Sequence, residues 1–350
     1  MITDYPYFRP KELYKLLGAR KKDVARVESI LQDYFGKPVV VLNSARTGAY
    51  IALAAKKMKR TDEVFVQPYM SKCILDTITE CAVPSLSLSA KTKAILVVHQ
   101  YGYPQDMDSI LNMARERDLL VIEDSAFSFG SRYKGKMVGS FGTCAIFSFP
   151  KAFSTILGGC LVTEDADILA FAREYLRRTD TGFRRSMSTL ALLPSLMENA
   201  APSAAKRARW SRFLTLTYSQ FLQFPNANKH VCRVFPRTLE EFSLQIEARK
   251  KNLAVFRAHF GGTPSYPHEV EADSEVVPFV APYFGDVATL ERIDQLLLSH
   301  EVETRGVHHF DRNRTMLSPE YVPMLRIPVH QHISETKMNE ICELIARAAT

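Results

Sequence analysis

The sequence predicts an α/β protein in which a mostly parallel sheet is covered by helices on both faces, followed by a smaller α+β domain. Between residues 38 and 163, short runs of Val, Ile and Leu alternate with stretches of helical spacing. Uninterrupted apolar strands are typical of sheets that are buried on both faces. The chain has 350 residues, of which 46% are hydrophobic and 24% are charged. It is therefore long enough to bury a large core and has the composition of an ordinary globular protein.

The predicted elements follow one another in order. Apolar runs predict strands at 38–43, 63–68, 93–100, 119–124, 144–149 and 158–163, and amphipathic stretches predict helices at 47–59, 71–82, 106–118 and 164–176. Near the C-terminus, Ser334 offers an N-cap before an apolar stripe at Met338, Ile341 and Ile345, which predicts a helix over 334–349.

These elements predict three regions. We expect a large α/β/α domain over residues 1–176 and a small α+β domain over residues 238–350. Between them, residues 177–237 are basic, rich in helical patterns and interrupted by Pro194, Pro202 and Pro225. We expect this middle region to be an insertion that belongs to the large domain.

The net charge of +7 is concentrated in the middle of the chain. Residues 176–237 hold eleven Lys or Arg against two Asp or Glu. Such a segment attracts anionic substrates or phospholipid, although a solvated helical face is an equally good interpretation. Within 177–224 the basic residues mix with Trp, Phe and Leu, as they do in helices that lie on a membrane surface. Peripheral membrane contact through 177–224 is therefore one expectation, and a helical subdomain at a dimer interface is the other.

Several classes of protein are not expected. No apolar run approaches the roughly 18 residues of a membrane-spanning helix, and the N-terminus lacks a signal-peptide pattern. The six cysteines are scattered singly, which predicts reduced core residues in a cytoplasmic protein. If the basic segment touches a membrane, this would be at the inner face. His330 and His332 have no carboxylate or cysteine beside them, so we expect no metal, and we expect no nucleic-acid partner.

Polar residues gather where the predicted strands end. In parallel sheets, ligands bind beyond the carboxyl ends of the strands. A lysine and an aspartate at two such ends, Lys151 and Asp124, suit pyridoxal 5'-phosphate. The amine can form a Schiff base with the cofactor aldehyde, and the carboxylate can keep the pyridine nitrogen protonated. The alternatives are that Asp124 caps a helix and that Lys151 extends to solvent.

Residues 92–163 carry a series of short motifs in a fixed order. They read TKAI, H-x-YG, D-x-D-x-I, VIEDSA, Y-K-G-x-x-x-G, F-S-F, Lys151 and a Gly-Gly pair. This series resembles the DegT/StrS family of sugar aminotransferases, which are pyridoxal phosphate enzymes of fold type I. The resemblance is weaker over residues 40–90 and loose over 238–350.

The resemblance implies roles for individual residues around the cofactor. It implies Lys151 as the Schiff-base lysine, Asp124 as the partner of the pyridine nitrogen, and Ser148 as a hydroxyl donor to the phosphate. In the family a Ser-Gly-Thr turn that opens a helix also binds the phosphate; here that turn reads Ser44-Ala45-Arg46, and the helix N-terminus after it would still attract the anion.

Three positions depart from the family pattern. Phe127 stands where the family usually has Gln or His, Ser71 stands near the place of a ring-stacking aromatic, and Leu157 replaces an acidic residue. Tyr69 or Phe127 is therefore the candidate for stacking on the cofactor, with Ser71 beside it.

The resemblance also implies substrate contacts and an assembly. His308 and His309 match a substrate-contacting pair of the family, and His99 lies at a strand end; a structural role is as consistent with each of them. The implied protein is a homodimer with its active site at the interface. It moves an amino group, typically from glutamate, to a nucleotide-linked keto-sugar, in amino-sugar, surface-polysaccharide or secondary-metabolite biosynthesis. The three departures motivate an alternative, a catalytically degenerate member that serves as a binding or scaffold protein, including at the membrane surface.

Overall fold

A computed structural model of the chain describes residues 2–3, 22–153, 155, 157–182, 197, 210, 222 and 224–349. In this part of the chain, a seven-stranded sheet has the order β1-β9-β8-β5-β4-β2-β3. Strand β9 is antiparallel to both of its neighbours, and the remaining pairs are parallel. The predicted mostly parallel sheet is therefore confirmed.

The elements of the large sheet and its helices have the following bounds: α1 (Lys22–Phe35), β1 (Val39–Leu42), α2 (Ala45–Ala55), β2 (Glu63–Phe65), α3 (Lys72–Thr79), β3 (Val83–Ser85), β4 (Thr92–Val98), α4 (Met107–Glu116), β5 (Leu120–Asp124), β8 (Cys144–Ser148), α5 (Phe149–Ala152), β9 (Gly159–Thr163), α6 (Ala166–Thr179) and α10 (Lys229–Glu240). Every strand and helix predicted between residues 38 and 176 is present. Their ends differ from the prediction by a few residues, because helix and strand termini carry the weakest local signal.

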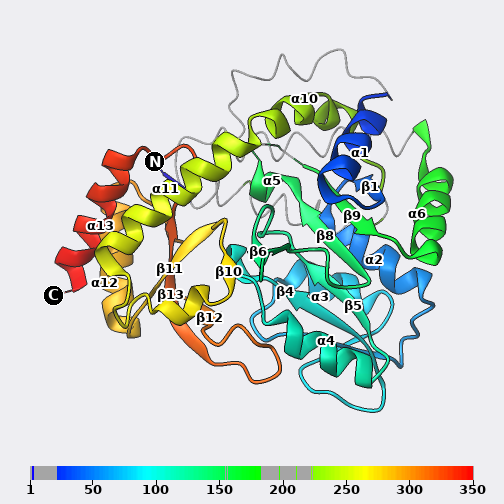
Figure 1. Ribbon diagram of the computed structural model, residues 1–350, viewed down its shortest axis with the longest axis horizontal. Helices are drawn as coiled ribbons and strands as arrows, with labels where there is room; N and C mark the ends of the chain where they lie inside the picture. The colour runs from blue at the N-terminus through cyan, green and yellow to red at the C-terminus, as the bar shows by residue number, and fades with distance from the viewer. Residues whose placement is uncertain are drawn as a thin grey trace.

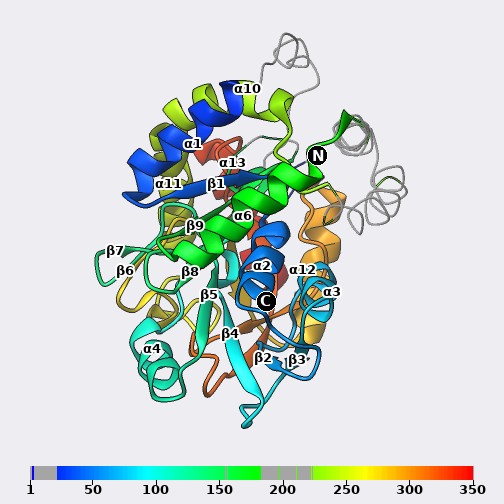
Figure 2. The same cartoon turned by 90° about the vertical axis from the view of Figure 1, so that its right-hand side faces the viewer.

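Alternating side chains bury both faces of this sheet. In β1, Val39 and Val41 pack toward α1 and α10, whereas Val40 and Leu42 pack toward α2, α3 and α6. Helix α4 covers β4 and β5 on the same face of the sheet as α1. Figure 2 shows these helices on the two sides of the sheet, which makes the three-layer α/β/α architecture.

A smaller sheet lies at the other end of the molecule (Figure 1). Its order is β11-β13-β12, all antiparallel, and it packs with the C-terminal helices around a core of its own. The elements of this part are α11 (Phe242–Phe260), β11 (Val280–Phe284), α12 (Val287–Ser299), β12 (His308–Asp311), β13 (Tyr321–Pro328) and α13 (Glu335–Ala349). A third sheet joins β10 (Ser274–Glu275), β6 (Arg132–Tyr133) and β7 (Lys136–Met137), and short 3-10 turns span Gln100–Gly102 and His268–Glu271.

The C-terminal helix agrees with its prediction. The Ser334 hydroxyl accepts a hydrogen bond from the Lys337 backbone at 3.2 Å, as an N-cap does. Met338, Ile341 and Ile345 are all fully buried. The division of the chain after residues 176 and 237 stays a prediction, because most of residues 183–223 lie outside the described residues.

Candidate active site

Lys151 lies in the short helix α5, directly after strand β8. Pro150 occupies the first turn of this helix, where a missing backbone N–H costs nothing. Burial lowers the pKa of the Lys151 amine, and the carboxylate of Asp124 opposes that effect. The positive charges of Arg46 and Arg326 lower the pKa further. The amine nitrogen lies 3.6 Å from the centroid of the Phe127 ring, which argues against the alternative of a lysine that extends to solvent.

Asp124 is the last residue of β5, on the strand beside β8, and only 9% of it is exposed. Its Oδ1 accepts a hydrogen bond from the backbone N–H of Ala126 at 3.1 Å. No helix begins in the segment after it, so the alternative role as a helix N-cap is wrong. Burial raises the pKa of Asp124, and the charge of Lys151 limits the rise. The two predicted residues thus lie at the ends of neighbouring strands, and the charge of each acts on the other.

The N-terminus of α2 lies beside the same strands. The Ser44 side chain occupies the N-cap position but does not cap the helix, because its hydroxyl contacts Thr47 Oγ1 at 3.0 Å. A Cβ atom on Gly159 would lie 2.6 Å from the backbone nitrogen of Ala45, so only glycine permits this approach of β9 to the helix. A helix N-terminus attracts anions, and the charge of Arg46 reaches Lys151 from this turn.

Two hydroxyl groups lie close to these residues in the sequence, one at the end of β8 and the other directly after β5. Ser148 ends β8 and is half-buried, and its side chain does not cap α5. Ser125 follows Asp124 and is fully buried, and its hydroxyl has no hydrogen-bond partner among the described residues. Buried hydroxyls normally find a partner. An orphan hydroxyl at this place is therefore consistent with a site that holds a polar ligand.

The candidates for stacking on the cofactor are divided between two places. Phe127 lies against Lys151, with the amine nitrogen 3.6 Å from the ring centroid, and packs on Phe279. Tyr69 is 64% exposed and stacks instead on His309, with centroids 4.4 Å apart. Ser71 occupies the N-cap position of α3, with its hydroxyl 3.4 Å from Cys73 Sγ.

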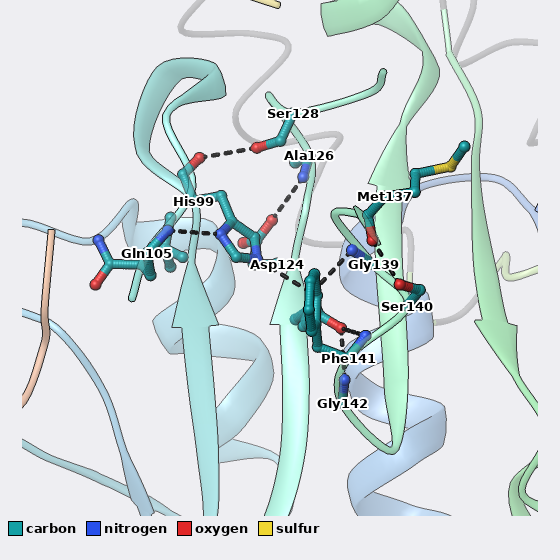
Figure 3. Close-up of polar contacts among 12 residues, drawn as sticks. His99, Gln105, Asp124, Ala126, Ser128, Met137, Gly139, Ser140, Phe141 and Gly142 are labelled. Atoms are coloured by element: carbon teal, nitrogen blue, oxygen red, sulfur yellow. Dashed lines mark hydrogen bonds and ion pairs between the residues drawn. The ribbon is translucent and has the colours of Figure 1, made fainter. Parts of the chain in front are cut away.

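His99 is fully buried in a hydrogen-bond network (Figure 3). Its Nε2 lies 3.2 Å from Glu123 Oε2, and its Nδ1 accepts from the backbone N–H of Gln105 at 3.0 Å. Glu123 also accepts from the backbone N–H groups of Gly139, Phe141 and Gly142. This geometry argues against the predicted substrate contact at His99, because both ring nitrogens are engaged inside the protein. Glu123 points away from Asp124, as strand alternation predicts.

His308 and His309 begin strand β12 and are both half-buried. His309 contacts Tyr69, which stands on the turn between β2 and α3, and Tyr321 completes the group of rings at 5.0 Å from Tyr69. The structure thus joins one predicted substrate residue to one predicted cofactor residue. Their roles with ligands stay predictions.

Sequence reasoning missed three residues around Lys151. Arg326 of β13 and Cys73 of α3 act on its amine electrostatically. Arg249 of α11 hydrogen-bonds to the backbone of Lys151 and Ala152. Arg326 and Arg249 occur in segments where the family motifs are loose, so only their positions in the fold reveal them.

These residues fit pyridoxal phosphate. The cofactor aldehyde needs an amine of lowered pKa, and its ring nitrogen needs a carboxylate; Lys151 and Asp124 supply them. Its phosphate needs hydrogen-bond donors, which the uncapped N-terminus of α2 and the unpaired Ser125 hydroxyl offer. In the part of the chain that the structure describes, no cluster of side chains could hold a metal ion, and all six cysteines are free thiols. Nor does any helix among the described residues have the length and apolar character needed to cross a membrane.

Comparison with known proteins gives a consistent result. Residues 85–196 match the model of the DegT/DnrJ/EryC1/StrS aminotransferase family. The chain is 36% identical to GDP-perosamine synthase of Caulobacter vibrioides over 171 residues, which are 43% of this chain and 46% of that protein. It is 35% identical to L-glutamine:scyllo-inosose aminotransferase of Streptomyces griseus, over 45% of this chain and 42% of the relative. The matched part thus spans about half the length of these relatives.

The fold is shared over the whole chain. The crystal structure of the aminotransferase TlmJ from Streptoalloteichus hindustanus superposes with a TM-score of 0.71 at 16% identity, covering 98% of this chain and 97% of TlmJ. At this level of identity the similarity concerns the fold, which is that of fold type I sugar aminotransferases.

Proposed function

We propose that the chain, of which residues 85–196 match the DegT/DnrJ/EryC1/StrS aminotransferase family model, is an aminotransferase that uses pyridoxal phosphate and acts on a nucleotide-linked keto-sugar. The amino donor is glutamate in this proposal. The product would serve amino-sugar, surface-polysaccharide or secondary-metabolite biosynthesis. The names of the similar proteins support a carbonyl-bearing sugar or cyclitol as the acceptor, and GDP-perosamine synthase supports the nucleotide.

One observation carries the proposal. The Lys151 amine and the Asp124 carboxylate lie at the ends of neighbouring strands and act on each other electrostatically, and burial favours the neutral form of each. An uncharged amine is a better nucleophile than an ammonium ion, and it can accept a proton and return it. A lysine on a protein surface lacks both properties.

Each residue of the site has a task in this reaction. When bound, pyridoxal phosphate supplies an aldehyde that links to amines and a ring that accepts electron density. Lys151 holds the cofactor and carries a proton at its Nζ, while Asp124 orients the ring through its nitrogen. The first turn of α2, with Ala45 and Arg46, and the Ser148 hydroxyl hold the phosphate. Phe127 keeps water from the amine.

The substrate would enter from the side of the small sheet. Tyr69 and His309 form a stacked pair there, and Arg326 brings a positive charge toward Lys151. This combination suits an anionic sugar derivative, because a diphosphate needs cations and a pyranose ring packs well on aromatic faces. We assign the amino-group exchange to the space between these residues and Lys151.

The assembly and location are also part of the proposal. We infer a homodimer with the active site at its interface, which light scattering on the purified protein would test. Membrane contact through residues 177–224 stays a prediction, because most of that segment lies outside the described residues. Salt-sensitive binding to vesicles containing anionic lipid would support it.

The first experiment is an absorption spectrum of the purified chain with pyridoxal phosphate. We expect a visible band from the lysine-linked cofactor, and borohydride should then attach the cofactor permanently to the peptide that contains Lys151. The Lys151→Ala variant should lack the band. Asp124→Asn should keep cofactor binding, but its amino transfer should fall by about 10²-fold or more, because a preorganised charge is lost. Donor and keto-sugar screens follow from a positive result.

The alternative is a binding protein that has lost catalysis. Phe127 favours it, because an apolar ring occupies the place of a polar residue next to the amine. Absence of the band in the unmodified chain at saturating cofactor would overturn the enzyme proposal and leave this alternative.

A further inference from the structure

Arg249 is a buried cation to which the proposed reaction gives no task. It lies on α11, on the stripe that also buries Leu253, Phe256 and Phe260. A stripe of this kind normally consists of apolar residues. Arg249 is only 4% exposed, and burial lowers its pKa to about 10, so it remains charged at neutral pH. A buried charge of this kind is costly unless its hydrogen bonds are satisfied.

Within the described part of the chain, the hydrogen bonds of Arg249 go to neutral oxygen atoms. Its Nη2 donates to the carbonyl of Ala152 at 2.8 Å and to the carbonyl of Lys151 at 3.4 Å. Its Nε donates to Gln331 Oε1 at 3.0 Å, and its Nη1 lies 3.5 Å from the carbonyl of Pro278. None of these four acceptors is a carboxylate. The guanidinium therefore binds to backbone and amide dipoles from three separate segments.

The first two acceptors, the carbonyls of Lys151 and Ala152, are at the C-terminal end of helix α5. Helix α5 spans only Phe149–Ala152, and the last carbonyl groups of a helix have no partner within it. Arg249 satisfies two of them, and a cation is favourable at the C-terminal end of a helix. The turn that carries the Lys151 side chain is thus held by a residue of another helix.

The other acceptors belong to the side of the small sheet. Pro278 precedes β11, and Gln331 follows β13. Asn252, one turn further along α11, donates to the carbonyls of Val329, His330 and Ile333. Figure 1 shows α11 running from the large sheet to the small one. Arg249 is therefore held in place by segments next to the small sheet, and it in turn holds the backbone of the Lys151 turn.

We propose that Arg249 is a positioning residue, whose guanidinium fork fixes the carbonyl end of α5 and so sets where the Lys151 amine lies relative to Asp124. This inference rests on the proposed function, since it concerns the same lysine. Arg249 does not touch the pocket through its side chain in this role; it acts through the backbone of Lys151. A lysine at position 249 would keep the charge but lose the fork.

The Lys151 amine reports on this geometry without any cofactor. The charged and titratable groups that act on it are Asp124 from β5, Cys73 from α3, Arg46 from α2 and Arg326 from β13. Movement of the α5 turn would change the distance to each of them and admit water. The pKa of Lys151 would then rise toward the ordinary lysine value.

The test is competitive acetylation of the full cofactor-free chain over a range of pH, with the Lys151 peptide quantified by mass spectrometry. In Arg249→Lys and Arg249→Gln, we expect labelling of Lys151 at neutral pH to fall about tenfold, as a rise of one pKa unit dictates. The control is Arg257→Gln, on the same helix, which removes the pairing of Arg257 with Glu271. It should leave Lys151 unchanged.

Each outcome decides the proposal. If Arg249→Lys labels Lys151 as the unmodified chain does, only the charge matters and positioning is wrong. If both Arg249 variants and the control lower the labelling equally, the effect is general loosening and positioning is again wrong. Arg249→Lys preserves most of the buried side chain, so it serves if Arg249→Gln does not fold. A chain that binds no pyridoxal phosphate would refute the proposed function, whereas this labelling would still be readable.

Discussion

The amine nitrogen of Lys151 lies 3.6 Å from the centroid of the Phe127 ring. The Phe127 ring is itself held by Phe279 at 4.6 Å and Tyr101 at 5.5 Å. Two opposing effects act on the amine here: burial favours its neutral form, whereas the face of an aromatic ring favours the cation. Phe127 thus takes part in setting the charge state of the lysine.

Substitutions at Phe127 should separate these effects. Phe127→Leu keeps the site apolar but removes the ring, so the pKa of Lys151 should fall by about 0.4–1.5 units, as a cation–π contribution of about 0.5–2 kcal/mol implies. Phe127→Gln introduces an acceptor and water, so the pKa should rise. Competitive acetylation of Lys151 over pH measures both changes. Shifts of the same sign in the two variants would show that the ring acts only by excluding water.

Gly159 should be intolerant of any side chain. A Cβ there would lie 2.6 Å from Ala45 N and 2.5 Å from the carbonyl oxygen of Phe147, both backbone atoms that cannot give way cheaply. We expect Gly159→Ala to lower the free energy of unfolding by about 1–3 kcal/mol, as overpacking does. Inorganic phosphate should also compete less well with the cofactor for binding to this variant, because the first turn of α2 is displaced.

Gly182 provides the matched control for this prediction. An added Cβ at Gly182 meets no atom of the described residues within 4 Å, so Gly182→Ala should leave both quantities unchanged. Urea unfolding monitored by circular dichroism gives the stability. Equal stability of the two variants would contradict the close approach of β9 to α2.

Asp311 should make the protein less stable as the pH rises. It is fully buried, and burial raises its pKa to about 6. Its ordinary pKa in an unfolded chain is about 3.9, so the folded state binds more protons between about pH 4 and pH 6. The unfolding free energy contributed by this group therefore falls across that window. Asp311→Asn should stabilise the protein by on the order of 2 kcal/mol at pH 8 and by little at pH 4.

Asp286 should behave in the opposite way. It is the N-cap of α12, and hydrogen bonds from Thr289 lower its pKa. Its contribution is present at neutral pH and lost as the pH falls, so Asp286→Asn should destabilise at pH 8. Urea titrations of both variants at pH 4 and pH 8 make the comparison. A destabilised Asp311→Asn at pH 8 would refute the assigned cause.

The stack of Tyr69 on His309 should contribute to stability. Tyr69 has a φ of 57°, a backbone conformation that costs a non-glycine residue free energy. Its ring is nearly parallel to the His309 ring, with an angle of 9° between the two planes. A double-mutant cycle with Tyr69→Ala and His309→Ala should give a coupling free energy of about 0.5–1 kcal/mol. Tyr69→Phe should retain it. A coupling of zero would mean that the turn between β2 and α3 is held by other contacts.

The sequence by itself determined the sheet, its helices and the central pair of the site. The alternation of Val39 to Leu42 prescribes two buried faces locally, and Asp124 and Lys151 follow strands whose carboxyl ends must share one edge. Such patterns are readable because they depend on residues that are neighbours along the chain.

Only the tertiary structure decided what surrounds this pair. His99 at a strand end was compatible with a substrate contact, and its burial against Glu123 indicates a structural role. Phe127 beneath the amine, Arg249 on the carbonyls of the lysine turn and Tyr69 on His309 join segments that are distant in the sequence. Their meeting depends on loop conformation and on how the large sheet and the small sheet are placed relative to each other, which residue type and spacing do not encode.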